Sequence, residues 1–157
     1  MLNIVLTRID DRLIHGQVIT AWSKITKADW IIVVDDEVAE DSFMVKVLKM
    51  AAPSSIKVEI FTIADAAAAL EAEDTGEKVI ILVKTPKTVL GLIKAGVSIT
   101  ELNLGGMGAT QGRKQLYRNI SISAEEKDIF KELLTLGVDV FVQIVPDANK
   151  MPMATMI

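Results

Sequence analysis

The sequence contains no cysteine and only one histidine among its 157 residues. Without cysteine there is no disulfide and no thiolate metal site, and a zinc ion held by one imidazole would need three carboxylates beside it. We therefore expect neither a bound metal nor another cofactor. No apolar run approaches the ~20 residues that span a bilayer, and the N-terminal stretch MLNIVLTRIDDR reaches charged residues too early for a secretory signal. These absences predict a cytoplasmic protein.

Basic residues are fewer than acidic ones, 17 against 21, and they are unevenly distributed. The net charge is −4 at pH 7, which argues against non-specific binding to nucleic acid. Residues 29–83 carry four basic and twelve acidic side chains, a net charge of −8. Residues 84–118 carry six basic and one acidic side chain, a net charge of +5. Whether these basic residues share one surface depends on the fold.

Apolar residues make up half of the chain, and their pattern predicts strands that alternate with helices. Continuous apolar runs such as Trp30–Val34 are typical of strands buried on both faces of a parallel sheet. The expected strands are residues 2–6, 30–34, 56–61, 79–83, 101–104, 120–122 and 138–145. Between several of them lie helix caps, such as Thr85-Pro86 and the capping box of Ser123 and Glu126.

This alternation predicts a single α/β domain over residues 1–157. We expect an open, mostly parallel twisted β-sheet of about seven strands with helices on both faces. Ligands of such sheets bind outside the carboxyl ends of the strands. Residues 7–16, 35–37, 84–86 and 105–112 are polar or glycine-bearing loops at those ends. His15, Thr85 and Gly106 should therefore lie on the same edge of the sheet.

The first of these loops is rich in ionic side chains. Within residues 7–18, TRIDDRLIHGQV, they are Arg8, Asp10, Asp11, Arg12 and His15. Free backbone amides at the following helix start and bidentate arginines are typical phosphate donors. An imidazole that is largely neutral near pH 7 is a plausible nucleophile. From residue types alone, an alternative stays open, in which His15 is a surface or capping residue and the arginines pair with the neighbouring aspartates.

The stretch RIDDRLIHGQV closely resembles the active-site loop of the mannose/fructose/sorbose family of phosphotransferase-system IIB components. The resemblance extends over essentially the whole chain, through WIIVVDD, AAP, VKTP, LNLGGM and VPD in the expected order. It implies an open, mostly parallel sheet covered by helices. It also implies a phosphoryl group that is accepted on Nδ1 of the loop histidine from a IIA partner. The group then passes to a sugar that enters through membrane IIC and IID subunits.

Carried onto this sequence, the resemblance implies that the chain is a protein-Nπ-phosphohistidine–sugar phosphotransferase. It also implies peripheral association with a membrane transporter. His15 matches the phosphorylated residue, and Asp10 is expected to shape the loop. The expected phosphate-binding residues are Arg8, Arg12, Gly16 and Gln17.

The basic stretch adds a hypothesis about the donor protein. Two of its loops are expected to open on the His15 edge, where a basic rim would face acidic residues of IIA. The candidate partner contacts are Lys84, Thr85, Gly106, Arg113 and Lys114.

Other hypotheses fit these residues less well. A receiver domain would explain Asp10 and Asp11, but it needs an aspartate after the third strand, where the sequence reads Phe61-Thr62-Ile63. The run GGMGATQG lacks the spacing of a P-loop, and a tight turn is the simpler interpretation. A regulatory or binding module of the same fold and an unrelated enzyme for nucleotides or phosphosugars remain alternatives. The sequence leaves open which sugar is transported, whether the chain forms a homo-oligomer, and the role of residues 149–157.

Overall fold

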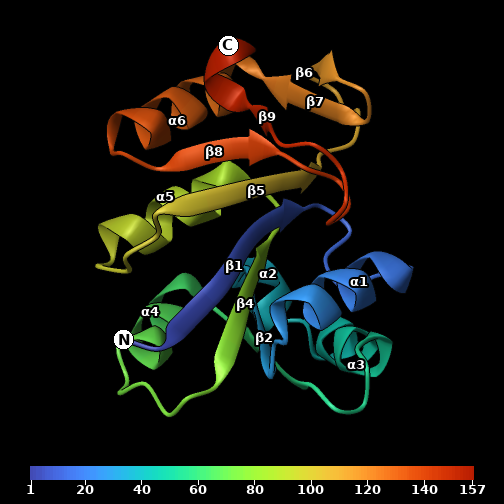
Figure 1. The fold of residues 1–157 in the computed structure, drawn as a ribbon, viewed down its shortest axis with the longest axis vertical. Coiled ribbons are helices and arrows are strands. Elements are labelled where there is room, and N and C mark those ends of the chain that lie inside the picture. Colours follow the sequence, from blue (N-terminus) through green and yellow to red (C-terminus); the bar gives the residue numbers. More distant parts are fainter.

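The computed structural model describes residues 1–16 and 18–157. Within them, the main sheet has seven strands in the order β3-β2-β4-β1-β5-β8-β9. Figure 1 shows β5 beside β8 in this sheet. All neighbouring strands of this sheet run parallel except the pair β8 and β9. The strands are β1 (Asn3–Asp10), β2 (Trp30–Val34), β3 (Lys57–Phe61), β4 (Lys78–Val83), β5 (Glu101–Gly106), β8 (Asp139–Val142) and β9 (Met151–Pro152).

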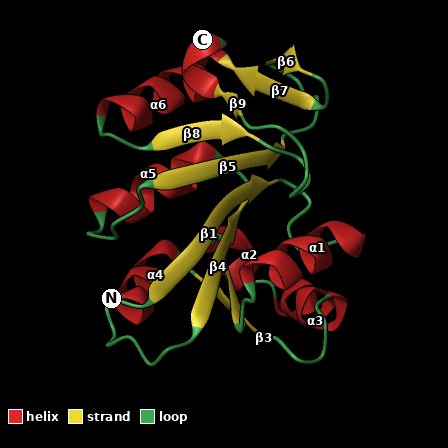
Figure 2. Cartoon of the chain, in the orientation of Figure 1, coloured by secondary structure: helices red, strands yellow, loops and turns green.

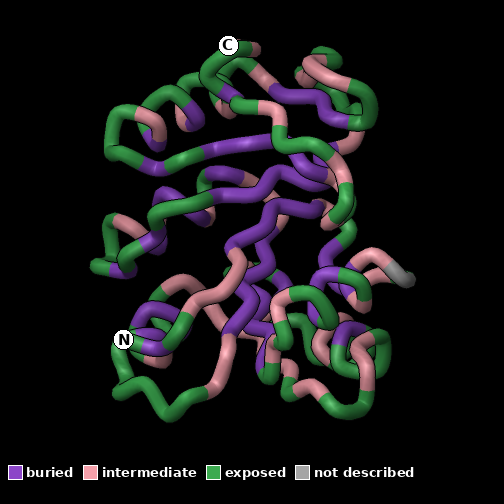
Figure 3. Tube along the Cα trace, in the orientation of Figure 1, coloured by how far each residue is buried: buried purple, intermediate pink, exposed green. Residues whose placement is uncertain are grey.

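Helices cover both faces of this sheet. One apolar cluster joins the sheet to α4 (Ile63–Leu70), α5 (Pro86–Lys94) and α6 (Ala124–Thr135). The other joins it to α1 (Gly16–Thr26), α2 (Asp36–Ala39) and α3 (Ser42–Ala51). Purple segments in Figure 3 follow the central strands, where β2 is buried along its whole length. The predicted fold class is therefore confirmed.

Two details of the strand prediction are wrong. Residues 120–122 do form a strand, but β7 (Ile120–Ser123) pairs with β6 (Arg113–Tyr117) in a separate antiparallel ribbon (Figure 2). The seventh strand of the main sheet is instead β9, whose two residues carry too little pattern to be recognised. It belongs to the C-terminal stretch with no assigned role, which continues into the 3-10 helix η1 (Met153–Thr155) and buries Met153 completely. Within that stretch, β9 thus forms one edge of the sheet.

The first strand is longer than its apolar run predicts. β1 extends to Asp10, so that the polar residues at its end belong to the sheet and not to a loop. Backbone pairing with β4 and β5 holds them there although their side chains are not apolar. Polar side chains at this end of β1 are therefore held rigidly.

The predicted caps account for several helix boundaries. Ser123 and Glu126 form the reciprocal capping box at the start of α6, and the Thr62 side chain accepts a hydrogen bond from the Asp65 amide at the start of α4. Gly137, with φ of +88°, follows the end of α6 in the left-handed conformation that glycine adopts without strain. None of the helices in residues 1–16 and 18–157 has the length and apolar character needed to cross a membrane.

Candidate active site

The carboxyl ends of β1, β4 and β5 lie side by side. Ile9 of β1 pairs with Val83 of β4, and Asp10 pairs with Gly106 of β5. Thr85 is the second residue after β4, and the His15 side chain contacts Asp10. The prediction that His15, Thr85 and Gly106 share one edge of the sheet is therefore confirmed.

The short loop after β1 returns the chain to the end of its own strand. The Leu13 amide donates a hydrogen bond of 2.9 Å to the Asp10 carbonyl. Leu13 has φ of +58°, a conformation that a leucine side chain disfavours, but the side chain is buried, as is that of Ile14. Apolar burial thus holds the turn, and His15 follows as the extended N-cap of α1, with no capping bond from its side chain.

Asp10 is the centre of the site. Its Oδ2 lies 3.0 Å from His15 Nε2, and its Oδ1 accepts from the Arg12 amide at 3.1 Å and from Arg12 Nε at 3.2 Å. Arg8 Nη2 lies 3.4 Å from the same Oδ2 that faces His15. The Asp10 side chain is 1% exposed, whereas His15 is 23% and Arg12 is 53% exposed. These are the contacts expected of a residue that shapes the loop.

The electrostatic balance keeps Asp10 ionised. Burial raises the pKa of its carboxyl, but hydrogen bonds from His15 and Arg12 outweigh that effect, so that the pKa lies below its ordinary value. An ionised carboxylate only accepts hydrogen bonds, so its contact with Nε2 assigns the imidazole hydrogen to that nitrogen. In the neutral ring, Nδ1 of His15 is then the nitrogen with a free lone pair.

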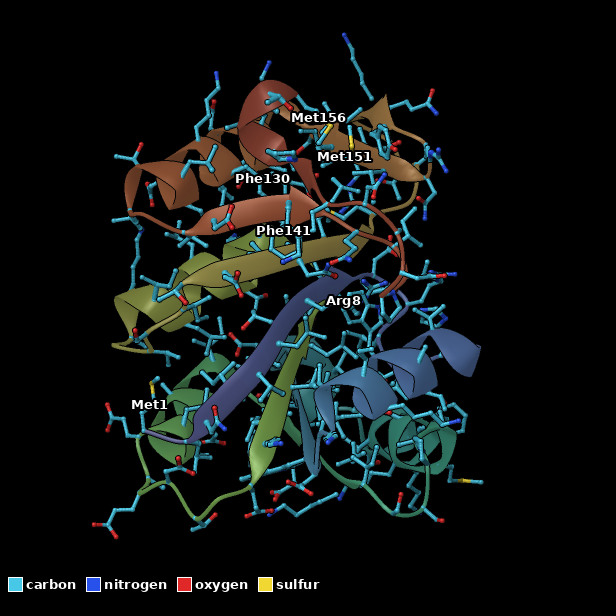
Figure 4. All side chains as sticks on the ribbon, viewed as in Figure 1. Met1, Arg8, Phe130, Phe141, Met151 and Met156 are labelled. Carbon is cyan, nitrogen blue, oxygen red and sulfur yellow. The ribbon has the colours of Figure 1, made fainter. Side chains whose placement is uncertain are left out.

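Arg8 does not lie where a phosphate ligand would. Its side chain is 1% exposed, and it donates to Asn103 Oδ1, to the carbonyl of Gln143 at 2.9 Å and to that of Ile144 at 3.0 Å. Figure 4 shows Arg8 at the carboxyl end of β1. The prediction of direct phosphate binding is therefore corrected for Arg8, because its side chain is buried and both of its Nη groups already donate inside the protein.

Gly105 and Gly106 have a role that the sequence analysis missed. The register between β1 and β5 shifts after Ile9, which leaves Gly105 without a partner in a β-bulge. A Cβ on Gly105 would lie 2.0 Å from Arg8 Cζ, and one on Gly106 would lie 2.9 Å from Asp10 Oδ1. The glycine pair therefore makes room for the two side chains, and the predicted tight turn is wrong at these positions. The sequence did carry a signal for this role. Gly105 and Gly106 end one strand, and Arg8 and Asp10 lie at the end of its neighbour.

Arg113 is also largely internal. It donates to both carboxylate oxygens of Glu126 at 2.9 Å and to the Gly108 carbonyl at 3.0 Å. Asp11 lies 3.7 Å from Arg113 Nη1 and accepts from the Gly108 amide at 2.7 Å. Arg113 is only 11% exposed, so the prediction that it forms part of a free basic rim is corrected. Asp11 and Arg113 instead connect the His15 loop to β6 and α6.

The remaining predicted contacts differ in accessibility. Gly106 is buried, which removes it from the candidate partner contacts. Lys84 and Thr85 are half-buried at the end of β4, where Lys84 Nζ lies 4.0 Å from Asp35. Lys114 is exposed on β6. Gly16 begins α1 with φ of +47°. The predicted phosphate contact at Gln17 lies outside the described residues.

Comparison with known proteins identifies the family of this chain. Residues 4–157 match the model of the family described as "PTS system sorbose subfamily IIB component". The sorbose-specific EIIB component of Lacticaseibacillus casei is 42% identical over 143 residues, which cover 90% of this chain and 87% of that protein. The mannose-specific EIIAB component of Escherichia coli K12 is 40% identical over 155 residues, covering 97% of this chain and 47% of that protein.

A solved structure shows the same architecture. The IIBSor domain of the sorbose permease from Klebsiella pneumoniae superposes with a TM-score of 0.92 at 36% identity, covering 98% of this chain and 95% of that one. The chain therefore belongs to the sorbose subfamily of phosphotransferase-system IIB components, as its resemblance implied. The family is one of sugar phosphotransferases.

Proposed function

We propose that this chain carries a phosphoryl group on Nδ1 of His15, which it accepts from a IIA protein and passes to a sugar. The observation that carries the proposal is the 3.0 Å contact between His15 Nε2 and Asp10 Oδ2. It orients the ring and leaves Nδ1 as the nucleophilic nitrogen of a side chain that is partly exposed. The imidazole therefore needs no separate base to become reactive.

The transfer from IIA is a displacement at phosphorus. The Nδ1 lone pair forms the new N–P bond while the bond to the donor breaks, and the donor keeps that electron pair. Because Nε2 keeps its hydrogen, the phosphorylated ring is cationic. The Asp10 carboxylate, 3.0 Å away, stabilises that charge. This arrangement follows the logic by which a buried carboxylate orients and stabilises a catalytic histidine.

The transfer to the sugar reverses the roles. A sugar hydroxyl oxygen attacks phosphorus, the N–P bond breaks, and its electron pair returns to Nδ1. The hydroxyl proton passes to a base outside the contacts described for His15. Arg12, which is about half exposed and already held beside Asp10, is the side chain proposed to bind the phosphoryl oxygens in both steps. Amides at the start of α1, including that of Gly16, would supply further donors.

The proposed partners follow from the family. The mannose-specific relative from E. coli is named an EIIAB component, and this chain matches about half of it. That supports a IIA protein as the donor, with phosphoenolpyruvate as the ultimate source. Membrane IIC and IID subunits would supply the sugar, and the chain would work in the cytoplasm beside this transporter. Lys84, Thr85 and Lys114 stay proposed contacts for a partner.

The test is reconstitution with phosphoenolpyruvate, the general phosphotransferase proteins and a cognate IIA. Wild type should acquire one phosphoryl group that is labile in acid, and His15→Ala should acquire none. Lys46→Ala, which alters an exposed residue of α3, is the matched control and should behave as wild type. Label that persists in His15→Ala, or that survives acid, contradicts the proposal. Adding membranes with the permease then separates a sugar transferase from a regulatory module, which would be phosphorylated without passing the group on.

A further inference from the structure

Arg8 connects three parts of the chain that are far apart in sequence. Its guanidinium, at the end of β1, donates to the Asn103 side chain of β5 and to the carbonyls of Gln143 and Ile144, which follow β8. The two carbonyls are 135 and 136 residues away along the chain. The fourth acceptor is Asp10 Oδ2, at 3.4 Å. Every one of these partners belongs to the protein itself.

The surroundings of this cation are rigid. The Arg8 guanidinium lies 5.2 Å from the centre of the Trp22 ring, and Trp22 Nε1 donates to the same Ile144 carbonyl at 3.3 Å. Asn103 Nδ2 donates to the Gln143 carbonyl at 3.1 Å, and Gln143 Nε2 donates to the carbonyls of two residues further along its own loop. The acceptors are therefore also held by hydrogen bonds that do not involve the guanidinium.

A buried guanidinium is costly unless its donors are satisfied and its charge is balanced. Burial lowers the pKa of Arg8 to about 10, an effect that the Asp10 carboxylate partly offsets. Arg8 thus stays cationic at neutral pH. Its charge and the carboxylate of Asp10 form one buried pair, and the same Oδ2 also faces His15 Nε2.

We propose that Arg8 is a positioning residue for the phosphorylation site, and not a phosphate ligand. It fixes the Asp10 carboxylate so that Oδ2 faces His15 Nε2, and it ties that orientation to the backbone of Gln143 and Ile144. The proposal rests on the proposed function only for its effect on transfer. The orientation of the unphosphorylated His15 ring is an independent consequence.

Gly105 provides a way to move the guanidinium without changing any charge. A Cβ at this position would lie 2.0 Å from Arg8 Cζ and 2.2 Å or less from both Nη atoms, so Gly105→Ala must displace the guanidinium. Gly108→Ala is the matched control in the following loop. A Cβ there would lie 3.4 Å from the nearest side-chain atom, which is close to an ordinary contact. Arg8→Lys keeps the positive charge but loses the planar fork that reaches several acceptors.

The experiment combines ¹⁵N NMR of the His15 ring with single-turnover transfer from phosphorylated IIA. In wild type and Gly108→Ala the Nε2–H tautomer should predominate. In Gly105→Ala and Arg8→Lys the ring should shift to a mixture of tautomers, and transfer should slow by about tenfold, the loss of roughly one charge-assisted hydrogen bond.

Three results would overturn the proposal. One is a wild-type tautomer in folded Gly105→Ala; another is slowed transfer with an unchanged tautomer. The third result is measured on the wild type. Its Arg8 Nη hydrogens should exchange slowly with water, and fast exchange would show an accessible guanidinium. If wild type itself accepts no phosphoryl group on His15, the proposed function fails, whereas the tautomer data still decide the role of Arg8.

Discussion

Replacing Asp10 with asparagine tests how much the buried carboxylate contributes to transfer. The substitution keeps the shape of the side chain but removes the charge that faces His15 Nε2 at 3.0 Å, Arg12 Nε at 3.2 Å and Arg8 Nη2 at 3.4 Å. An amide can also donate to Nε2, which would stabilise the opposite tautomer. Both changes act against a nucleophilic Nδ1.

The expected magnitude follows from the His15 contact. A hydrogen bond to a charged group contributes about 1.5–3 kcal/mol, which corresponds to about 10- to 150-fold in rate if the phosphorylated ring loses it. The Asp10→Asn variant should also lose stability, because Arg8 and Asp10 are each 1% exposed and the cation would stay buried. Removing one partner of a buried pair costs about 3–5 kcal/mol, and the remaining amide oxygen should keep the cost near the lower limit.

The assay is rapid-quench transfer of labelled phosphate from IIA, with urea unfolding of the same samples. Asp29→Asn, at an exposed position before β2, is the matched control. Wild-type transfer by a folded Asp10→Asn protein would refute the role assigned to the carboxylate. Slow transfer caused only by unfolding would be revealed by recovery at low temperature, where the folded fraction increases.

Two further predictions concern Arg12 and Glu126. Arg12→Lys should slow transfer by roughly tenfold with the fold intact, because a single ammonium group replaces a bidentate fork; transfer at the wild-type rate would remove Arg12 from phosphate binding. The free energy of unfolding should decrease in acid. Burial raises the pKa of Glu126, but the hydrogen bonds from Arg113 and from the Ser123 amide outweigh it, and the pKa of Asp10 is likewise below its ordinary value. A carboxyl group whose pKa is lowered in the folded state stabilises the fold when the pH lies above its ordinary pKa. That stabilisation is lost as the pH falls through the lowered pKa. Urea titrations should therefore give a constant stability from pH 7 to about 5 and a decrease below about 4, less steep in Glu126→Gln. An equally steep decrease in Glu126→Gln would show that the Arg113 pair is not its source.

Apolar runs and caps predicted most of the fold because they report local preferences. The β2 run and the Ser123 capping box needed no distant partner to be recognised. β9 could not be predicted, since two residues pair with β8 only through the backbone. The end of β1 was missed for a related reason, because its polar residues stay in the sheet through partners on β4 and β5.

The candidate site was predicted in part. His15 and Asp10 could be selected as candidates because ionic residues at a strand end, together with a long specific motif, indicate phosphate chemistry. Arg8 and Arg12 could not be told apart by residue type, since both are arginines near the histidine. Only the fold shows that Asn103 and Gln143 use the donors of Arg8, while Arg12 stays half exposed.

The long-range hydrogen bonds of Arg8 have a consequence for folding during synthesis. A chain leaves the ribosome from its N-terminus, and a domain generally folds as a unit. The loop with His15 emerges early, but the carbonyls that hold Arg8 lie 135 and 136 residues later. Until Gln143 and Ile144 have emerged, Arg8 lacks those acceptors and Asp10 lacks a fixed cation beside it. A nascent chain is therefore expected to lack the fixed Asp10 carboxylate, although His15 is already outside the ribosome.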